Sequence, residues 1–267
     1  ALEACVTRHG TLVGPLMTEL VGFKELTPYR GGWCGNEVFA GAFQKKTRKK
    51  ARDAAMAFGD ELGRLGYRGY FELDFLTDLD SGKVYLGECN PRITGASSMT
   101  NLSSFAHADA PLFLFHLLEW MGVDAEFDVE DLNRRWADPE YIDAWSQLGM
   151  KYTGDDVRHS SEAPRSGLWE IDGSGTIRHV RMQTHRRTVQ HENRAFFLRI
   201  SGQGDYLYNG ADLGILVSPG RFMTDEFELT DRARAWTQGI QSHYAGAPVA
   251  PAAREEVGIE PGGFKLL

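Results

Sequence analysis

Residues 66–101 read GYRGYFELDFLTDLDSGKVYLGECNPRITGASSMTN, and the pattern of this stretch predicts a β-hairpin. Apolar and aromatic residues are interspersed with acidic ones from about residue 70 to residue 76, and a second run with apolar and aromatic residues extends from residue 83 to residue 89. The segment between them is rich in Asp, Ser and Gly, which favour turns. We therefore expect two antiparallel strands joined by a turn at residues 78–82.

Acidic side chains lie on both predicted strands of this hairpin. Side chains two positions apart in a strand share a face, so Glu72 and Asp74 are expected to point the same way, as are Leu86 and Glu88. Asn90 follows two positions after Glu88. Carboxylates beside apolar neighbours repel one another unless a cation lies between them. Hard oxygen ligands suit Mg²⁺ or Mn²⁺, so the hairpin is a candidate metal site.

The predicted hairpin also resembles that of a known family. Its strand DFL at residues 74–76, its turn, and the run ECNPR at residues 88–92 are similar to the metal-binding hairpin of the ATP-grasp superfamily. That pattern is shared by biotin carboxylase, carbamoyl phosphate synthetase and many carboxylate–amine ligases. The resemblance covers residues 1–101. It implies an α+β fold class, with an antiparallel sheet and helices that form the C-terminal lobe of an ATP-grasp fold.

The resemblance assigns a role to five residues of the hairpin. It implies that Glu88 bridges two Mg²⁺ ions on the phosphates of ATP and that Asn90 ligates the second ion. It implies that Asp74, or Glu72 in a shifted alignment, ligates the first. Arg92 is implied to be the catalytic residue, which steadies an acyl-phosphate or the phosphoryl group in transfer. The implied cofactors are therefore ATP and Mg²⁺, or Mn²⁺ in its place.

Residues before the hairpin are candidate contacts to the nucleotide or the acyl substrate. The resemblance places Glu3 just past the strand that reads the adenine. The loop TPYRGGWCGNE at residues 27–37 is rich in Gly and therefore conformationally permissive. We expect Trp33 and Asn36 to contact the nucleotide and Arg30 to contact the substrate. The alternative is a plain surface loop.

Two other segments carry candidate substrate contacts. The small and polar run ITGASSMTN at residues 93–101 follows the metal strand directly, which makes Ser97 a candidate, although its hydroxyls can equally cap the next element. A basic cluster at residues 181–191 includes Arg186 and Arg187. Guanidinium groups bind carboxylates through paired hydrogen bonds, so this cluster can receive a substrate carboxylate. The alternative is surface charge in a loop.

Periodicity and turn residues predict further helices and strands, and the chain as a whole is expected to have four parts. Apolar spacing predicts helices at residues 47–65, 105–121, 139–148 and 231–244, and the turn DGSG predicts a hairpin at residues 166–178. Asp138 and Pro139 suit the start of the third helix. The four parts are an ATP-grasp C-terminal lobe with the metal hairpin (1–104), a helical segment (105–153), a β-rich C-terminal lobe closed by a helix (154–246) and an irregular tail (247–267).

Composition is that of an ordinary globular protein. Of 267 residues, 42% are hydrophobic and 25% are charged, and the net charge is −8. The excess of negative charge disfavours nucleic acid or an anionic membrane as partner. No apolar run approaches the roughly 20 residues that span a bilayer, and no signal peptide is visible. Three cysteines without Cys-x-x-Cys spacing fit a reducing compartment, so we expect a cytoplasmic protein.

The resemblance implies an ATP- and Mg²⁺-dependent carboxylate–amine ligase that forms peptide or amino-acid amide bonds through an acyl-phosphate. Its expected partners are small-molecule carboxylate and amine substrates, with a homo-oligomer as a further option. The Lys-bearing lid of a complete ATP-grasp unit is not recognised, so we expect an N-terminal lobe in a longer parent chain or in a separate chain. Two alternatives stay open: a biotin-carboxylase-like or carbamoyl-phosphate-forming enzyme, and a non-catalytic binding or regulatory subunit with a grasp-like fold.

Overall fold

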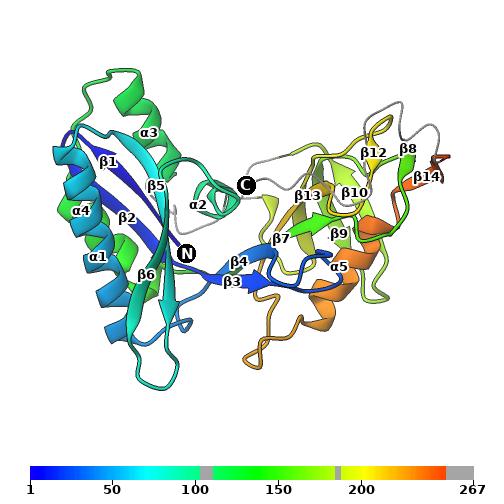
Figure 1. Ribbon diagram of the computed structural model, residues 1–267, viewed down its shortest axis with the longest axis horizontal. Helices are drawn as coiled ribbons and strands as arrows, with labels where there is room; N and C mark the ends of the chain where they lie inside the picture. Colours follow the sequence, from blue (N-terminus) through cyan, green and yellow to red (C-terminus); the bar gives the residue numbers. More distant parts are fainter. Residues whose placement is uncertain (103–110, 184–187, 251–267) are drawn as a thin grey trace. The chain divides into compact units, whose positions relative to one another are not determined.

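The chain forms two compact units in a computed structural model that describes residues 1–102, 111–183 and 188–250 (Figure 1). The first unit comprises Ala1–Thr18 and Asn36–Trp145, and the second comprises Glu19–Gly35 and Ser146–Leu267. The backbone therefore passes between the units after Thr18, after Gly35 and after Trp145. The predicted parts, with boundaries after residues 104, 153 and 246, divide the chain differently and stay a prediction about its domains.

The described residues form an α+β fold with antiparallel strand pairs, which confirms the predicted fold class. The strands are β1 (Leu2–Thr7), β2 (Gly10–Leu16), β3 (Thr18–Val21), β4 (Trp33–Val38), β5 (Gly69–Thr77), β6 (Val84–Asn90), β7 (Trp145–Lys151), β8 (Arg158–Glu162), β9 (Gly167–Ile171), β10 (Ile177–Arg181), β11 (Arg194–Arg199), β12 (Tyr206–Leu207), β13 (Asp212–Pro219) and β14 (Ala245–Pro248). The helices are α1 (Lys45–Arg64), α2 (Ser97–Leu102), α3 (Leu112–Trp120), α4 (Val129–Ala137) and α5 (Asp231–Gln241), with a 3₁₀ turn, η2, at Pro139–Tyr141.

The first unit is built on a four-stranded sheet in the order β2-β1-β5-β6. Helix α1 covers one face of this sheet, where Ala51 and Ala55 pack against Phe71 and Leu73 (Figure 1). Helices α3 and α4 cover the opposite face through a second apolar cluster. Its members come from the sheet and from both of these helices: Cys5, Leu12, Tyr70, Leu112, Phe115, Leu132 and Trp136. The alternation of apolar side chains along β1 and β5 thus supplies both faces of a buried sheet.

The second unit contains a seven-stranded sheet in the order β10-β9-β11-β13-β7-β4-β3 and a three-stranded sheet in the order β12-β8-β14. Its core includes Trp169, Phe197 and Trp236, which are almost fully buried. Trp236 comes from α5, and this helix is capped by Thr230, whose hydroxyl accepts a hydrogen bond from the backbone N–H of Ala233. The predicted β-rich character of this region is therefore observed, together with a packed helix.

One predicted helix is wrong. Residues 139–148 were expected to be helical, but Pro139–Tyr141 forms only a 3₁₀ turn, and β7 begins at Trp145. The side chain of Asp138 does cap this turn by accepting from the backbone N–H of Glu140. A cap and a first-position Pro start a helix but do not extend it, and the almost continuous burial of β7 favours a central strand. Of the predicted helix at 105–121, residues 103–110 lie outside the described part of the chain.

No helix within the described ranges is long and apolar enough to cross a lipid bilayer.

Candidate functional site

The predicted metal ligands lie on neighbouring pairs of the β5–β6 hairpin. Glu72 is paired with Asn90, and Asp74 is paired with Glu88. Residues paired across an antiparallel ladder share a face, and so do residues two apart in one strand. The structure therefore brings Glu72, Asp74, Glu88 and Asn90 together on one face at the end of the hairpin where β6 finishes.

A β-bulge determines which face of β6 each side chain occupies. The register shifts after Asp74, because Phe75 is paired with Leu86 and Gly87 has no partner residue. The expectation that Leu86 and Glu88 share a face is therefore wrong, since the extra residue moves Leu86 to the face of Phe75. A Cβ atom at Gly87 would lie 3.3 Å from the backbone oxygen of Asp74, so the bulge brings the two strands close together at the acidic pair.

Burial and mutual repulsion raise the pKa values of the two acidic residues on β5. Burial, together with the carboxylates of Asp74 and Glu3, raises the pKa of Glu72 to about 7, although the hydroxyl of Thr94 and the amino group of Ala1 oppose this rise. Burial also raises the pKa of Asp74, and Glu88 contributes in the same direction against the Ala1 amino group. Two carboxylates are thus held where ionisation is unfavourable without a nearby cation.

A buried carboxylate oxygen without a hydrogen-bond partner in the described part of the chain indicates that this face fits a metal ion. Oδ1 of Asp74 is buried and has no hydrogen-bond partner among the described residues, whereas Glu88 is exposed at the open side of the face. Buried oxygens are almost always paired, so this atom is a candidate ligand. The described residues contain no cluster of three His, Cys, Asp or Glu side chains that holds a metal by itself. Mg²⁺ usually takes one or two carboxylates together with substrate phosphates, so the set fits Mg²⁺.

Arg92 lies directly beside the predicted ligands. Its Nη2 donates to the side-chain oxygen of Asn90 at 3.0 Å, and its Nη1 donates to the backbone oxygen of Ile93 at 3.2 Å. The side chain is otherwise exposed to solvent. An amide oxygen has two lone pairs, so Asn90 can accept from Arg92 and still ligate a cation. The guanidinium is therefore placed next to the acidic face, where it can meet a phosphoryl or acyl-phosphate oxygen.

Glu3 lies on β1 opposite Glu72, but it is fully buried in a group of hydroxyls. Its carboxylate accepts from the hydroxyls of Ser97 and Tyr70, each at 2.5 Å, and from those of Thr94 and Thr100. Burial raises the pKa of Glu3, and these hydrogen bonds lower it. The network ties the start of α2 to β1. Apart from the hydroxyl-rich run at residues 94–100, no sequence pattern indicated the roles of Tyr70, Thr94 and Thr100.

Two residues of this network, Glu3 and Ser97, were predicted from the sequence to contact the nucleotide and the substrate. The hydroxyl of Ser97 already donates to Glu3, and all the oxygens of the Glu3 carboxylate are engaged. In the described structure both residues therefore act as anchors for the segment that follows Arg92. The predicted contact of Glu3 with the nucleotide and that of Ser97 with the substrate stay predictions.

The remaining residues predicted to contact the nucleotide or the substrate belong to different units of the chain. Trp33 and Arg30 belong to the second unit. The ring of Trp33 packs over Gly149, because a Cβ atom at this glycine would lie only 2.6 Å from Cζ3 of the ring. Arg30 is exposed. Asn36 is fully buried on β4 and belongs to the first unit. Arg186 and Arg187 lie outside the described residues.

The fold is similar to solved ATP-grasp structures. Biotin carboxylase from Campylobacter jejuni aligns with 92% of this chain and 46% of its own, with a TM-score of 0.53 and 12% identity. Pyruvate carboxylase from Rhizobium etli aligns with 96% of this chain and 23% of its own, with a TM-score of 0.51 and 12% identity. No protein-family model and no curated protein sequence matches the chain.

These comparisons confirm the resemblance to the ATP-grasp superfamily at the level of the fold. The chain spans less than half the length of either structure.

Proposed function

We propose that this chain is the C-terminal part of an ATP- and Mg²⁺-dependent carboxylate–amine ligase of the ATP-grasp type. In this reaction the γ-phosphoryl group of ATP is transferred to a carboxylate oxygen, ADP leaves, and an acyl-phosphate forms. An amine nitrogen then attacks the acyl carbon, inorganic phosphate leaves with the bonding electrons, and the nitrogen releases a proton, so that an amide or peptide bond results. Such chemistry depends on positioned phosphates and on charge neutralisation rather than on a protein nucleophile.

The observation that carries the proposal is the acidic face of the hairpin. Asp74 and Glu88 are paired, Glu72 and Asn90 form the next pair, and Oδ1 of Asp74 is buried without a partner. These four residues would hold Mg²⁺, which neutralises the charge of the ATP phosphates when it is bound. Biotin carboxylase of similar fold was solved as a β-γ-ATP complex, which supports ATP as the nucleotide.

The chain's own groups have separate roles in this proposal. Arg92 binds the transferred phosphoryl group or the acyl-phosphate through its exposed guanidinium, which Asn90 orients through the hydrogen bond at 3.0 Å. Glu3 positions the segment after Arg92 through the hydroxyls of Ser97 and Thr100. We further propose that a lid-bearing lobe, in a longer parent chain or a separate chain, completes the nucleotide site, and that the enzyme works in the cytoplasm on small-molecule carboxylates and amines.

Metal binding tests the proposal directly on the purified protein. Mn²⁺ replaces Mg²⁺ and is followed by its electron paramagnetic resonance signal, in the presence and absence of ATP. We expect Asp74→Asn and Glu88→Gln each to weaken Mn²⁺ binding at least about tenfold, since each removes one charged ligand. Asp80→Asn is the matched control, because Asp80 is an exposed acid in the turn of the same hairpin. Wild-type affinity in both ligand variants would contradict the assignment.

A biotin-carboxylase-like reaction, in which bicarbonate is the carboxylate, is a second candidate. The fold similarity to biotin carboxylase favours it. The two reactions are distinguished by the substrates that the complete enzyme needs in order to form ADP. A ligase needs an organic acid and an amine, whereas the alternative forms ADP with bicarbonate and no organic acid.

A further inference from the structure

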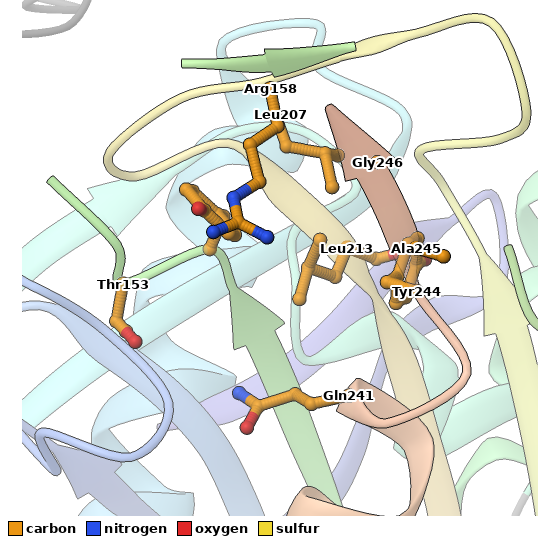
Figure 2. Close-up of a pocket in the computed structure, with 9 residues that line it drawn as sticks. Thr153, Arg158, Leu207, Leu213, Gln241, Tyr244, Ala245 and Gly246 are labelled. Atoms are coloured by element: carbon orange, nitrogen blue, oxygen red, sulfur yellow. The ribbon is translucent and has the colours of Figure 1, made fainter. Parts of the chain in front are cut away.

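The second unit contains a pocket that none of the residues discussed above lines. Its volume is about 240 Å³, and Arg158, Leu207, Leu213, Gln241 and Tyr244 form much of its wall. Figure 2 shows the guanidinium of Arg158 reaching into the space beside Leu207, with the amide of Gln241 approaching from the side of α5. The lining thus combines one cation, one amide and a set of apolar side chains.

Arg158 is held in a defined orientation. Its Nε donates to Oδ2 of Asp156 at 2.9 Å, and the hydroxyl of Tyr152 donates to Oδ1 of the same carboxylate at 2.5 Å. Apart from the neighbouring Tyr152 hydroxyl, the terminal nitrogens of Arg158 have no partner in the part of the chain that the structure describes. One edge of the guanidinium is therefore fixed from behind, and the other edge keeps donors available to a ligand.

The opposite part of the wall is apolar and ordered. Leu207 and Leu213 are almost fully buried, so their side chains form a preformed surface. The hydroxyl of Tyr244 lies 2.8 Å from the backbone oxygen of Leu213 and 3.0 Å from that of Ser201. Because the polar end of this side chain is satisfied within the protein, its ring contributes apolar surface to the pocket.

Gln241 adds an oriented acceptor. Its Nε2 donates to the backbone oxygen of Glu25 at 3.0 Å, which fixes the plane of the amide. Its Oε1 has no partner among the described residues. The pocket therefore presents hydrogen-bond donors at Arg158, an acceptor at Gln241 and apolar walls between the two.

We propose that this pocket binds a small organic monocarboxylate with an apolar body. The planar carboxylate pairs with the terminal nitrogens of Arg158, and the body lies on Leu207, Leu213 and the Tyr244 ring. A dianion such as phosphate is disfavoured because Asp156 already neutralises much of the Arg158 charge. The volume of about 240 Å³ accommodates about eight water-sized groups, which is the size of a six-carbon acid. This inference goes beyond the proposed ligase, since it requires neither nucleotide nor metal.

Hexanoate and hexanamide distinguish a carboxylate site from a general apolar cavity. The two compounds have the same size and differ in charge, and their binding to the complete protein is measured by saturation-transfer NMR titration. We expect hexanoate to bind at least about tenfold more tightly than hexanamide, and more tightly than acetate, which lacks the apolar body. Equal affinities for hexanoate and hexanamide would overturn the proposal.

Three variants locate the binding. Arg158→Met keeps the length of the side chain and removes its donors, so hexanoate affinity is expected to fall at least about tenfold. Arg178→Gln is the matched control, because Arg178 is an exposed arginine of the same unit paired with Glu170. Ala245→Trp fills the mouth of the pocket from an exposed position and is expected to block hexanoate even if Arg158→Met does not fold. Wild-type hexanoate affinity in Ala245→Trp or in folded Arg158→Met would contradict the site.

Discussion

Asp74 on β5 lies directly opposite Glu88 on β6, so that two carboxylates share one pair of the hairpin ladder. Like charges at directly opposed positions destabilise a sheet. A divalent cation between them converts this repulsion into attraction. The metal-free hairpin and the metal-bound hairpin should therefore respond in opposite ways to the loss of one charge.

Asp74→Asn is expected to leave the metal-free protein as stable as the wild type or more stable, because it removes one charge of the opposed pair. The same change removes a ligand, so stabilisation by Mg²⁺ should largely disappear. A ligand at 100 times its dissociation constant adds about 2.7 kcal/mol to the free energy of unfolding. Urea unfolding in EDTA and in MgCl₂ measures both effects. Equal stabilisation of wild type and variant by Mg²⁺ would count against the site, and Asp80→Asn again serves as control.

The stability of the metal-free protein should fall as the pH rises from the pKa of Glu72 in the unfolded chain to its pKa in the folded protein. Its ordinary pKa is 4.5, and burial together with Asp74 and Glu3 raises it to about 7 in the folded protein. The folded state therefore binds the proton more tightly, and this advantage is complete below the unfolded pKa and lost above the folded one. The shift corresponds to a loss on the order of 3 kcal/mol between about pH 4.5 and pH 7.

Glu72→Gln isolates this contribution, because Glu3 and Asp74 have raised pKa values too and act in the same direction. Urea unfolding in EDTA at a series of pH values should show a flatter profile for the variant than for the wild type. Parallel profiles would show that Glu72 does not titrate in this range.

Glu3→Ala is expected to destabilise the protein by about 3 kcal/mol or more, because four buried or half-buried hydroxyls lose their acceptor. Glu3→Gln keeps one acceptor oxygen and should cost less. Hydrogen exchange should accelerate at residues 94–102, since Ser97 and Thr100 tie this segment to β1. Glu61→Gln, at an exposed ion pair of α1 with Arg64, is the control and should change stability by less than about 1 kcal/mol. Unchanged exchange at 94–102 in Glu3→Ala would exclude the anchoring role.

Two glycines of α1 should respond differently to alanine. A Cβ atom at Gly59 would lie 2.4 Å from Cγ2 of Thr11 and 3.0 Å from Cζ of Phe71 in the packed interface with the sheet. Gly59→Ala is therefore expected to cost about 1–3 kcal/mol despite the better helix propensity of alanine. At Gly63 the nearest atom is Cγ1 of Val6 at 3.2 Å, so Gly63→Ala should be close to neutral. Thermal unfolding of both variants measures the difference, and equal melting temperatures would refute the close approach at Gly59.

The hairpin was predictable from the sequence because its signals are local. Alternation along residues 70–76 and the turn residues at 78–82 predict two strands, and the observed β5 and β6 follow them closely. The polar residues near the strand ends were sufficient to predict the acidic face. The bulge at Gly87 was not predicted, since a one-residue register shift depends on how the two strands pair rather than on the period of either strand.

Pairings between distant segments were the other source of error. Strand β7 was assigned to a helix because Asp138 and Pro139 are good helix-start residues. Its neighbours in the sheet are β13 and β4, which are remote in sequence on either side. The hydroxyl network around Glu3 was missed for the same reason, because Ser97 and Thr100 are more than ninety positions from it. A single buried carboxylate in a strand carries no local sign of its partners.

The three passages of the backbone between the units have a consequence for proteolysis and for expression of fragments. Residues 19–35 belong to the second unit but are followed by residues of the first, so one protease cut after Trp145 releases neither unit from the other. A gene fragment that starts at Ser146 would lack β3 and β4 and would leave β7 as an unprotected edge of its sheet. Such edges pair with other chains, so this fragment should aggregate, and the two units should be expressed together as one chain.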